Sequence, residues 1–213
     1  MPRPDLAALI HGPAELLPVS SSAHAELLGD RESATGAHLG SALATALVAP
    51  PSPRRLVMHL AAGAIPSAAG WKLRGRTWSP VPGLLLGSVA LVLAGRRSGD
   101  RSHDDAGALD GIAFGVAQAC ALLPGVSRLG ATICVARWRG FRDPAALSRE
   151  IGVPVSVGAA IVGGRPTLRQ TALAFTATAA SLPLLSRADR VPLRVWALYR
   201  CGLALALMRG SRR

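Results

Sequence analysis

Two apolar segments of this chain are interrupted in the same way, and this internal repeat constrains the fold more than any other feature. Residues 8–25 read ALIHGPAELLPVSSSAHA, and residues 114–131 read FGVAQACALLPGVSRLGA. The segments align with a constant shift of 106 residues, which pairs Pro18 with Pro124. Each reads as a helix that ends at Leu-Leu-Pro, a short turn, and a second helix that begins at serine.

An apolar segment that breaks near its middle suits a re-entrant helix–loop–helix hairpin better than a membrane span. We therefore predict two re-entrant hairpins, near residues 5–30 and 109–137. One hairpin lies in each half of a single membrane domain, 1–213, whose halves are about 1–100 and 101–213. Interrupted segments in corresponding positions indicate an inverted repeat, with the binding site where the two breaks meet.

Composition favours a polytopic membrane protein over a soluble one, because 50% of the residues are hydrophobic and only 17% are charged. The predicted fold is all-α, with about six transmembrane helices besides the two hairpins. Some of them must tilt or be half-helices, because a crossing needs about 20 apolar residues. The predicted spans are 34–50, 56–71, 81–96, 144–164, 168–186 and 191–208.

The formal net charge of +12 comes almost entirely from arginines. We interpret most of them as anchors at the membrane interface that attract anionic headgroups. Nucleic acid is not an expected partner, because only 4% of residues are aromatic and no basic stripe is interleaved with them. Arginine and lysine counts do not settle the orientation in the membrane.

The breaks carry the polar residues that a site needs. Pro18 disfavours continuation of the first helix, and the serines at 20–22 are good N-cap residues for the next one. A helix that starts there directs free N–H groups and its positive dipole end into the gap, which favours an anion. The second break repeats this arrangement and adds Arg128, whose guanidinium can hold phosphate oxygens in a bidentate fork. This arrangement suits a phosphate or diphosphate carried on a lipid.

ELLPVSSSAH (15–24) and LLPGVSRLGAT (122–132) resemble the two signature motifs of the bacterial undecaprenyl-diphosphate phosphatase family, the bacitracin-resistance type. HLGSALA (38–44) and ALYRCGLALAL (197–207) also resemble family segments, so the likeness extends over nearly the whole chain. The resemblance implies a multi-pass enzyme of the bacterial plasma membrane, commonly a dimer. Such an enzyme hydrolyses undecaprenyl diphosphate to the monophosphate with a divalent cation, Mg²⁺ or Ca²⁺, and recycles the lipid carrier for cell-wall (peptidoglycan) synthesis.

The resemblance also assigns roles to residues. Expected catalytic residues are Glu15, Ser21, His24 and Arg128. Ser21 attacks the terminal phosphorus or orients a water, and His24 acts as general base and then acid. The hypothesis leaves a phosphoserine intermediate and direct water attack equally open. Expected substrate contacts come from Ser20, Ser22, Gly125, Ser127 and Thr132.

Simpler roles stay open for several of these residues. Ser21 is alternatively only an N-cap, and His24 only a histidine at the interface. Ser20, Ser127 and Thr132 either contact phosphate or serve only as caps.

The chain departs from the family pattern at two positions. His11 stands where the family has Glu or Gln, and Leu129 stands where it usually has a second serine. His11 and Glu15 lie one helical turn apart, so both can reach one metal ion. Because imidazole prefers softer metals than magnesium, the change at His11 bears directly on metal binding. The alternative is that His11 only caps or packs.

Two rival functions follow from the same features. Broken helices in an inverted repeat also build transporters, so the chain alternatively binds or carries polyprenyl phosphate without hydrolysing it. A purely structural membrane subunit is the third reading, and it predicts neither binding nor hydrolysis.

Overall fold

The computed structural model describes residues 4–28, 34–73, 78–163 and 166–210, and within these ranges the chain is helical, with no strand. Short 3-10 turns occupy Pro53–Arg55, His103–Asp105 and Leu182–Leu184. The helices are α1 (Pro4–Glu15), α2 (Ser21–Leu27), α3 (Ala34–Ala46), α4 (Leu56–Leu73), α5 (Val81–Ala94), α6 (Ala108–Cys120), α7 (Arg128–Trp138), α8 (Pro144–Gly163), α9 (Leu168–Ser181), α10 (Leu185–Ala188) and α11 (Leu193–Gly210).

Helices lie at all six predicted spans, but α3 and α9 end four and five residues early. α3 ends at Ala46, shortly before the prolines at 50, 51 and 53. α9 ends at Ser181 because Pro183 interrupts the 168–186 segment, which continues as a 3-10 turn and α10. Among the described residues, only α8 is both long and apolar enough to cross a membrane, while α5 and α6 are shorter apolar helices.

Both predicted helix breaks are confirmed. The first separates α1 from α2 at residues 16–20, and the second separates α6 from α7 at residues 121–127; residues 29 and 30 of the first predicted hairpin lie outside the described part of the chain. Each break contains one residue with positive φ, Ser20 at 86° and Gly125 at 85°. The aligned partner of Gly125 is Val19, a β-branched residue for which positive φ is strongly unfavourable. The left-handed position therefore moves one residue on, to Ser20.

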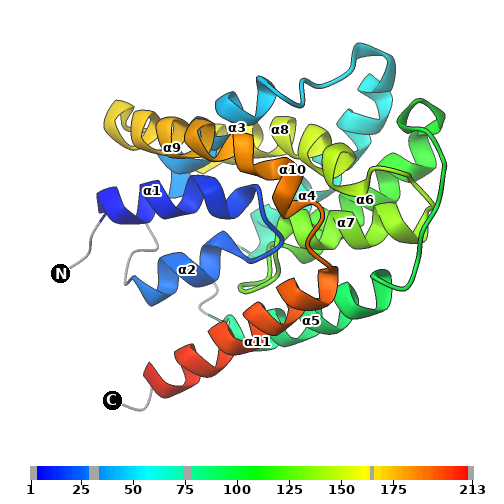
Figure 1. Ribbon diagram of the computed structural model, residues 1–213. Coiled ribbons are helices and arrows are strands. Elements are labelled where there is room, and N and C mark those ends of the chain that lie inside the picture. The colour runs from blue at the N-terminus through cyan, green and yellow to red at the C-terminus, as the bar shows by residue number, and fades with distance from the viewer. Residues whose placement is uncertain (1–3, 29–33, 74–77, 164–165, 211–213) are drawn as a thin grey trace.

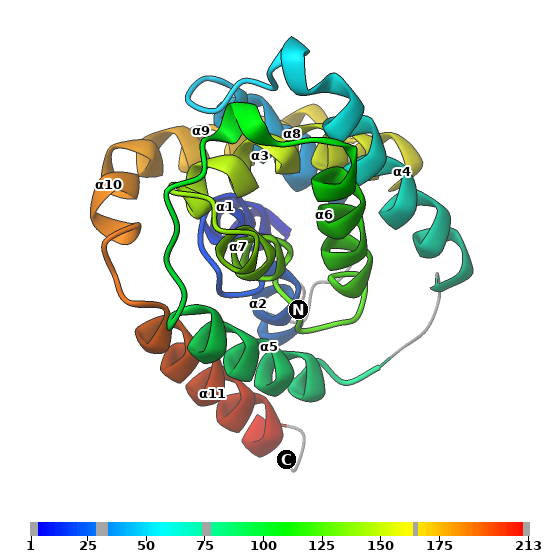
Figure 2. The ribbon, with the colours of Figure 1, turned by 90° about the vertical axis from the view of Figure 1, so that its right-hand side faces the viewer.

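The two breaks lie at the centre of the molecule. Figure 2 shows α1 and α7 inside a ring formed by the other long helices. α9 packs against both α1 and α3, and α11 packs against α5 (Figure 1). Glycines allow the approach of α9, because a Cβ on Gly12 or Gly40 would overlap the α9 backbone.

Arg200 of α11 joins both breaks to the outer helices. Its side chain is buried, with 1% of its surface exposed. Nη1 donates to the Pro18 carbonyl at 3.2 Å, and Nη2 donates to the carbonyls of Gly83 at 3.1 Å and Gly125 at 3.0 Å. One guanidinium therefore holds the first break, the second break and α5 in register.

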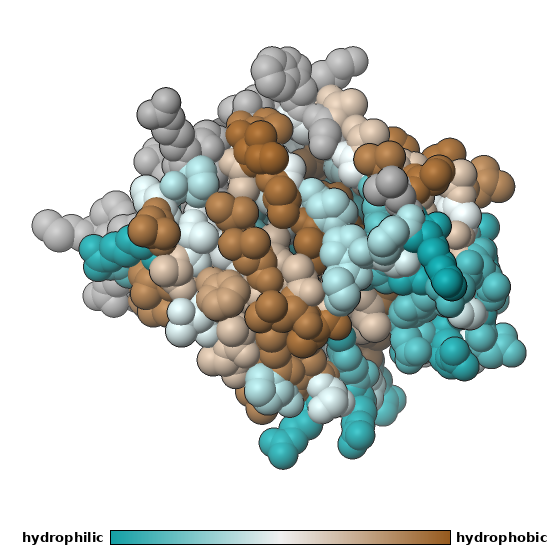
Figure 3. Space-filling view, turned by 90° about the horizontal axis from the view of Figure 1, so that it is seen from above, coloured by the Kyte–Doolittle hydropathy of each residue, from teal (hydrophilic) through white to brown (hydrophobic). Residues whose placement is uncertain are grey.

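The outer surface combines a wide apolar area with a charged end. Hydrophobic residues form a band over the face shown in Figure 3, with hydrophilic residues gathered beside it. Leucines and valines of α5 and α11 are among the exposed apolar side chains, as on a lipid-facing surface. Asp110 at the start of α6 is buried and pairs with Arg101 and Arg139, each at 2.7 Å. Arg101, a loop residue, donates hydrogen bonds to the Asp110 carboxylate, and these raise the pKa of Arg101.

We predict that Arg200→Met will lower the free energy of unfolding by about 3 kcal/mol, because three carbonyls lose their donor. Thermal unfolding of the detergent-purified protein measures this loss. The matched control is Arg169→Met, which removes an exposed arginine paired with Asp5 and should cost less than about 1 kcal/mol. Equal stability of the two variants would contradict the role given to Arg200.

Candidate functional site

A cavity of about 370 Å³ lies between the two breaks, as the repeat predicts. Residues from α1, α2, α3, the second break, α7 and α8 line it. Of the predicted site residues, it brings together His11, Glu15, Ser21, Ser22, Ser127 and Arg128. The residues that flank the first break and residues of the second break therefore meet in one cavity, although residues 16–20 themselves do not line it.

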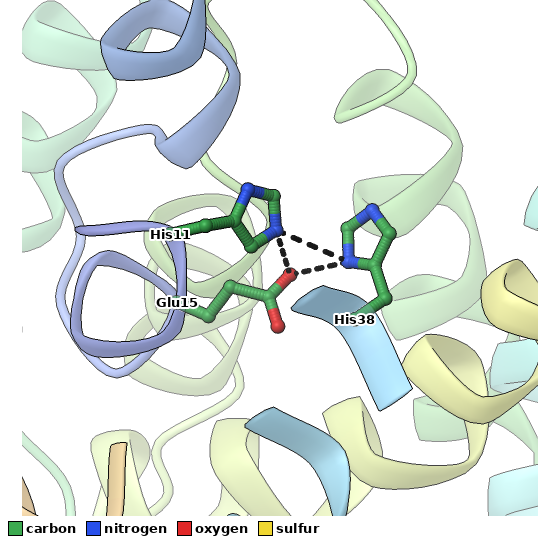
Figure 4. A group of neighbouring side chains, drawn as sticks. All are labelled: His11, Glu15 and His38. Atoms are coloured by element: carbon green, nitrogen blue, oxygen red, sulfur yellow. Dashed lines mark hydrogen bonds and ion pairs between the residues drawn. The ribbon is translucent and has the colours of Figure 1, made fainter. Parts of the chain in front are cut away.

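Glu15 is the centre of the polar contacts in this cavity. It is the last residue of α1, and its side chain is 6% exposed. Its Oε1 accepts a hydrogen bond from His38 Nδ1 at 2.8 Å and lies 3.4 Å from His11 Nε2 (Figure 4). Its Oε2 accepts a hydrogen bond from Ser41. The carboxylate is therefore fixed in orientation from two helices, α1 and α3.

Arg128 approaches the same carboxylate from the second break. It is the first residue of α7, and its Nη2 lies 3.6 Å from Glu15 Oε2. Gly152 on α8 leaves room for the guanidinium, since a Cβ there would overlap Arg128 Nη1. At 3.6 Å the pair is an ion pair without a close hydrogen bond, so the guanidinium donors are available to an anion in the cavity.

The α7 N-terminus has the features expected from its sequence. Ser127 is a true N-cap, because its Oγ accepts from the Gly130 N–H at 3.1 Å. The dipole of this helix, which runs for 11 residues, ends at the cavity. α2 differs, because it has only seven residues and Ser20 makes no side-chain cap.

The serines of the first break connect it to the second. Ser22 Oγ accepts from the Gly125 N–H at 3.5 Å and lies 3.1 Å from Ser20 Oγ. Ser20 itself is buried, and its hydroxyl contacts Ser22 within the turn. Ser21 and Ser22 are the serines of this motif that line the cavity.

The structure does not bring His24 into the cavity. Its Nδ1 donates to the Ser20 carbonyl at 2.7 Å, and its Nε2 lies 2.7 Å from the Tyr199 hydroxyl. Because Nδ1 carries a proton in this arrangement, the neutral ring accepts from Tyr199 through Nε2. His24 thus links α2 to α11, while Ser21 faces the cavity.

Thr132 also lies apart from the cavity lining. Its Oγ1 donates to the carbonyls of Arg128 at 3.0 Å and Leu129 at 3.1 Å, inside the first turns of α7. This bonding to preceding carbonyls is common for threonine in helices. The hydroxyl is therefore occupied within its own helix.

Sequence reasoning missed His38 and Ser41 as site residues. Both lie in the HLGSALA segment of α3, at positions i and i+3, and both contact Glu15. An ionisable residue within an apolar helix of a membrane protein is a functional candidate in its own right. That rule applied to His38 would have found it.

A larger cavity of about 660 Å³ lies behind the first break. None of the predicted site residues lines it, and its buried Arg149 is paired with Asp189. The smaller cavity is therefore the candidate active site, because it holds the unusual cluster of ionisable groups.

Among the described residues, His11, Glu15 and His38 form a group able to hold a metal ion, with ligand atoms within 4.8 Å of one another. The donor set does not fit the Mg²⁺ or Ca²⁺ that the resemblance implies, because those ions favour oxygen ligands. Two of the three donors are imidazole nitrogens, and the single carboxylate already faces Arg128.

Comparisons with known proteins relate this chain to one family. A family model described as bacitracin resistance protein BacA matches residues 52–206. An undecaprenyl-diphosphatase of Thermotoga maritima is 29% identical and covers 92% of this chain and 94% of its own length. A protein of the same name from Thermotoga sp. (strain RQ2) is 30% identical over the same shares. One from Thermomicrobium roseum is 35% identical over 51% of this chain and 45% of its own length.

We predict that Gly125→Ala will destabilise the protein by more than about 1 kcal/mol. An alanine at φ +85° is strained, and its Cβ would overlap the Pro80 carbonyl. Gly158→Ala is the control, since nothing lies near a Cβ at that helical position. Thermal unfolding should separate the two variants, and an unchanged melting temperature for Gly125→Ala would refute the prediction.

Proposed function

Because the chain belongs to the bacitracin resistance protein BacA family, we propose that it hydrolyses undecaprenyl diphosphate to undecaprenyl phosphate and inorganic phosphate. The proposal is supported by the names of its relatives, which are undecaprenyl-diphosphatases. The structural observation that carries it is the meeting of Glu15 and Arg128 in one cavity between two helix breaks.

The cavity supplies positive charge for the diphosphate. Phosphoryl transfer depends mainly on positioning and on stabilising charge on the phosphoryl oxygens. We assign this role to the Arg128 guanidinium and the N-terminal end of α7, which meet at the cavity. The ion pair with Glu15 orients the Arg128 guanidinium before substrate arrives.

The bond that breaks is the phosphoanhydride bond between the two phosphates. In one route, Ser21 Oγ attacks the terminal phosphorus, undecaprenyl phosphate leaves, and water then hydrolyses the phosphoserine. In the other route, Ser21 orients a water that attacks directly. The proton lost by the nucleophile needs an acceptor in both routes.

His24 is the acceptor expected from the resemblance, but in this structure its ring is engaged elsewhere. To act as general base it must release Tyr199 from Nε2, because Nδ1 already donates to the Ser20 carbonyl. A change of side-chain rotamer is therefore part of the proposed role. No step passes through Mg²⁺ or Ca²⁺, since the donor set does not fit them.

We also propose the membrane topology. The six predicted spans cross the bacterial plasma membrane, and the α1–α2 and α6–α7 pairs form re-entrant hairpins of two inverted halves. The helix at each expected range and the apolar surface of α5 and α11 support this arrangement. The dimeric state expected from the resemblance belongs to the same proposal.

Phosphate release from farnesyl diphosphate by the detergent-purified protein tests the activity. We expect release by the wild type and its loss in Glu15→Ala and Arg128→Ala. The control is Arg169→Ala, which changes an exposed arginine that does not line the cavity. This variant should retain the activity. Tight binding of prenyl phosphate without any release would instead favour the carrier function, and neither binding nor release would favour a structural subunit.

We predict that Arg128→Lys will reduce kcat/KM for phosphate release by about 100-fold. Lysine keeps the charge but loses the planar pair of donors that matches phosphate oxygens. Steady-state kinetics against Arg169→Lys measures the effect. Near-normal kinetics of Arg128→Lys would reduce Arg128 to a diffuse electrostatic contribution.

A further inference from the structure

The mismatch between the Glu15 cluster and hard cations points to a different metal. We infer that His11, Glu15 and His38 form a binding site for a borderline divalent transition ion of the Zn²⁺ class. The inference concerns metal binding alone, so it does not rest on the proposed hydrolytic function.

The chemical types of the donors fit this class. Zn²⁺ is commonly bound by imidazole nitrogen and carboxylate oxygen, and sites with two histidines and one glutamate leave a fourth position open. His11 Nε2, Glu15 Oε1 and His38 Nδ1 provide this set. Among these three residues, Mg²⁺ and Ca²⁺ would find one carboxylate and no other oxygen ligand.

The distances between the donors also fit. Donors placed about 2.0–2.1 Å from a tetrahedral Zn²⁺ lie about 3.4 Å apart. His11 Nε2 lies 3.4 Å from both Glu15 Oε1 and His38 Nδ1. The third edge, from His38 Nδ1 to Glu15 Oε1, is a hydrogen bond of 2.8 Å and has to open by about 0.6 Å when a metal replaces the proton. The donors are thus nearly in place before metal arrives (Figure 4).

The surroundings orient the carboxylate for a single metal bond. Ser41 and Arg128 both face Glu15 Oε2, while Oε1 is turned toward the two imidazoles. Such outer contacts typically fix metal-binding carboxylates. All three donor residues line the 370 Å³ cavity, so a fourth ligand from water or a phosphate can enter.

Titration with Co²⁺ tests the site, because four-coordinate Co²⁺ absorbs visible light strongly and six-coordinate Co²⁺ weakly. The protein is used as the full chain in detergent, without a histidine tag, after removal of metal with a chelator. We expect one Co²⁺ per chain with the strong spectrum, displacement by Zn²⁺, and no displacement by excess Mg²⁺ or Ca²⁺. Bound Zn²⁺ should also raise the melting temperature.

Single variants locate the site. His11→Gln and His38→Gln should each weaken Co²⁺ binding by about 100-fold, because the loss of a ligand costs at least as much affinity as the loss of a residue that only orients a ligand. His103→Gln is the matched control, because His103 bonds the Asp143 carbonyl outside the cluster. His11→Glu should weaken Co²⁺ binding and allow Mg²⁺ to compete, since it adds an oxygen donor.

Several results would overturn the inference: no stoichiometric Co²⁺ binding by the wild type, superimposable titrations for wild type and both glutamine variants, or equal displacement by Mg²⁺. Thermal unfolding without metal identifies any variant that fails to fold, and the remaining histidine variant then decides. Phosphate release is measured on the same samples. Release without Co²⁺ binding refutes the metal site alone, and Co²⁺ binding without release refutes the hydrolytic function alone.

Discussion

The position of both helix breaks depends on one buried cation, Arg200. A buried guanidinium is costly unless its donors are satisfied. Here carbonyls from the first break, the second break and α5 accept from Nη1 and Nη2 of Arg200, while its buried Nε has no partner among the described residues. Those carbonyls belong to irregular backbone or lie close to a break, where helical hydrogen bonds alone cannot satisfy every group. The arginine and the breaks therefore stabilise each other. The Arg200 contacts act together with Ser22 Oγ, which accepts from the Gly125 N–H and joins the two breaks directly.

The chemistry of the site follows from where the helices end. Leu-Leu-Pro ends α1 just after Glu15, and the turn after Pro124 starts α7 at Arg128. An acidic side chain at one helix terminus and a basic one at another thus meet in the cavity. Fixing Glu15 through His38 and Ser41 means that little reorganisation is needed when an anion binds.

The sequence was sufficient to predict the two breaks and a helix at each expected position, because a repeat with its prolines and serines reports local backbone directly. It was not sufficient for the ends of α3 and α9, which stop earlier than expected. It was not sufficient for His38 or Arg200, whose roles depend on how α3 and α11 pack. The direction in which a side chain points could not be predicted from the sequence either. His24 shares a motif with Ser21 but bonds Tyr199, a residue 175 positions away, and Thr132 bonds its own helix.

The charge balance of the cavity explains why the residue at position 11 matters. A second carboxylate at this position would place two negative charges beside an anionic substrate, and a hard divalent cation would be needed to offset their repulsion. With His11, one carboxylate faces one guanidinium, and position 11 adds no second carboxylate. The charges of Glu15 and Arg128 then offset each other, so a divalent ion held at the proposed site would add positive charge to the cavity. That charge would attract a diphosphate. On the proposed site, the change from oxygen to nitrogen at position 11 would alter the metal preference and leave Arg128 in place for phosphate binding.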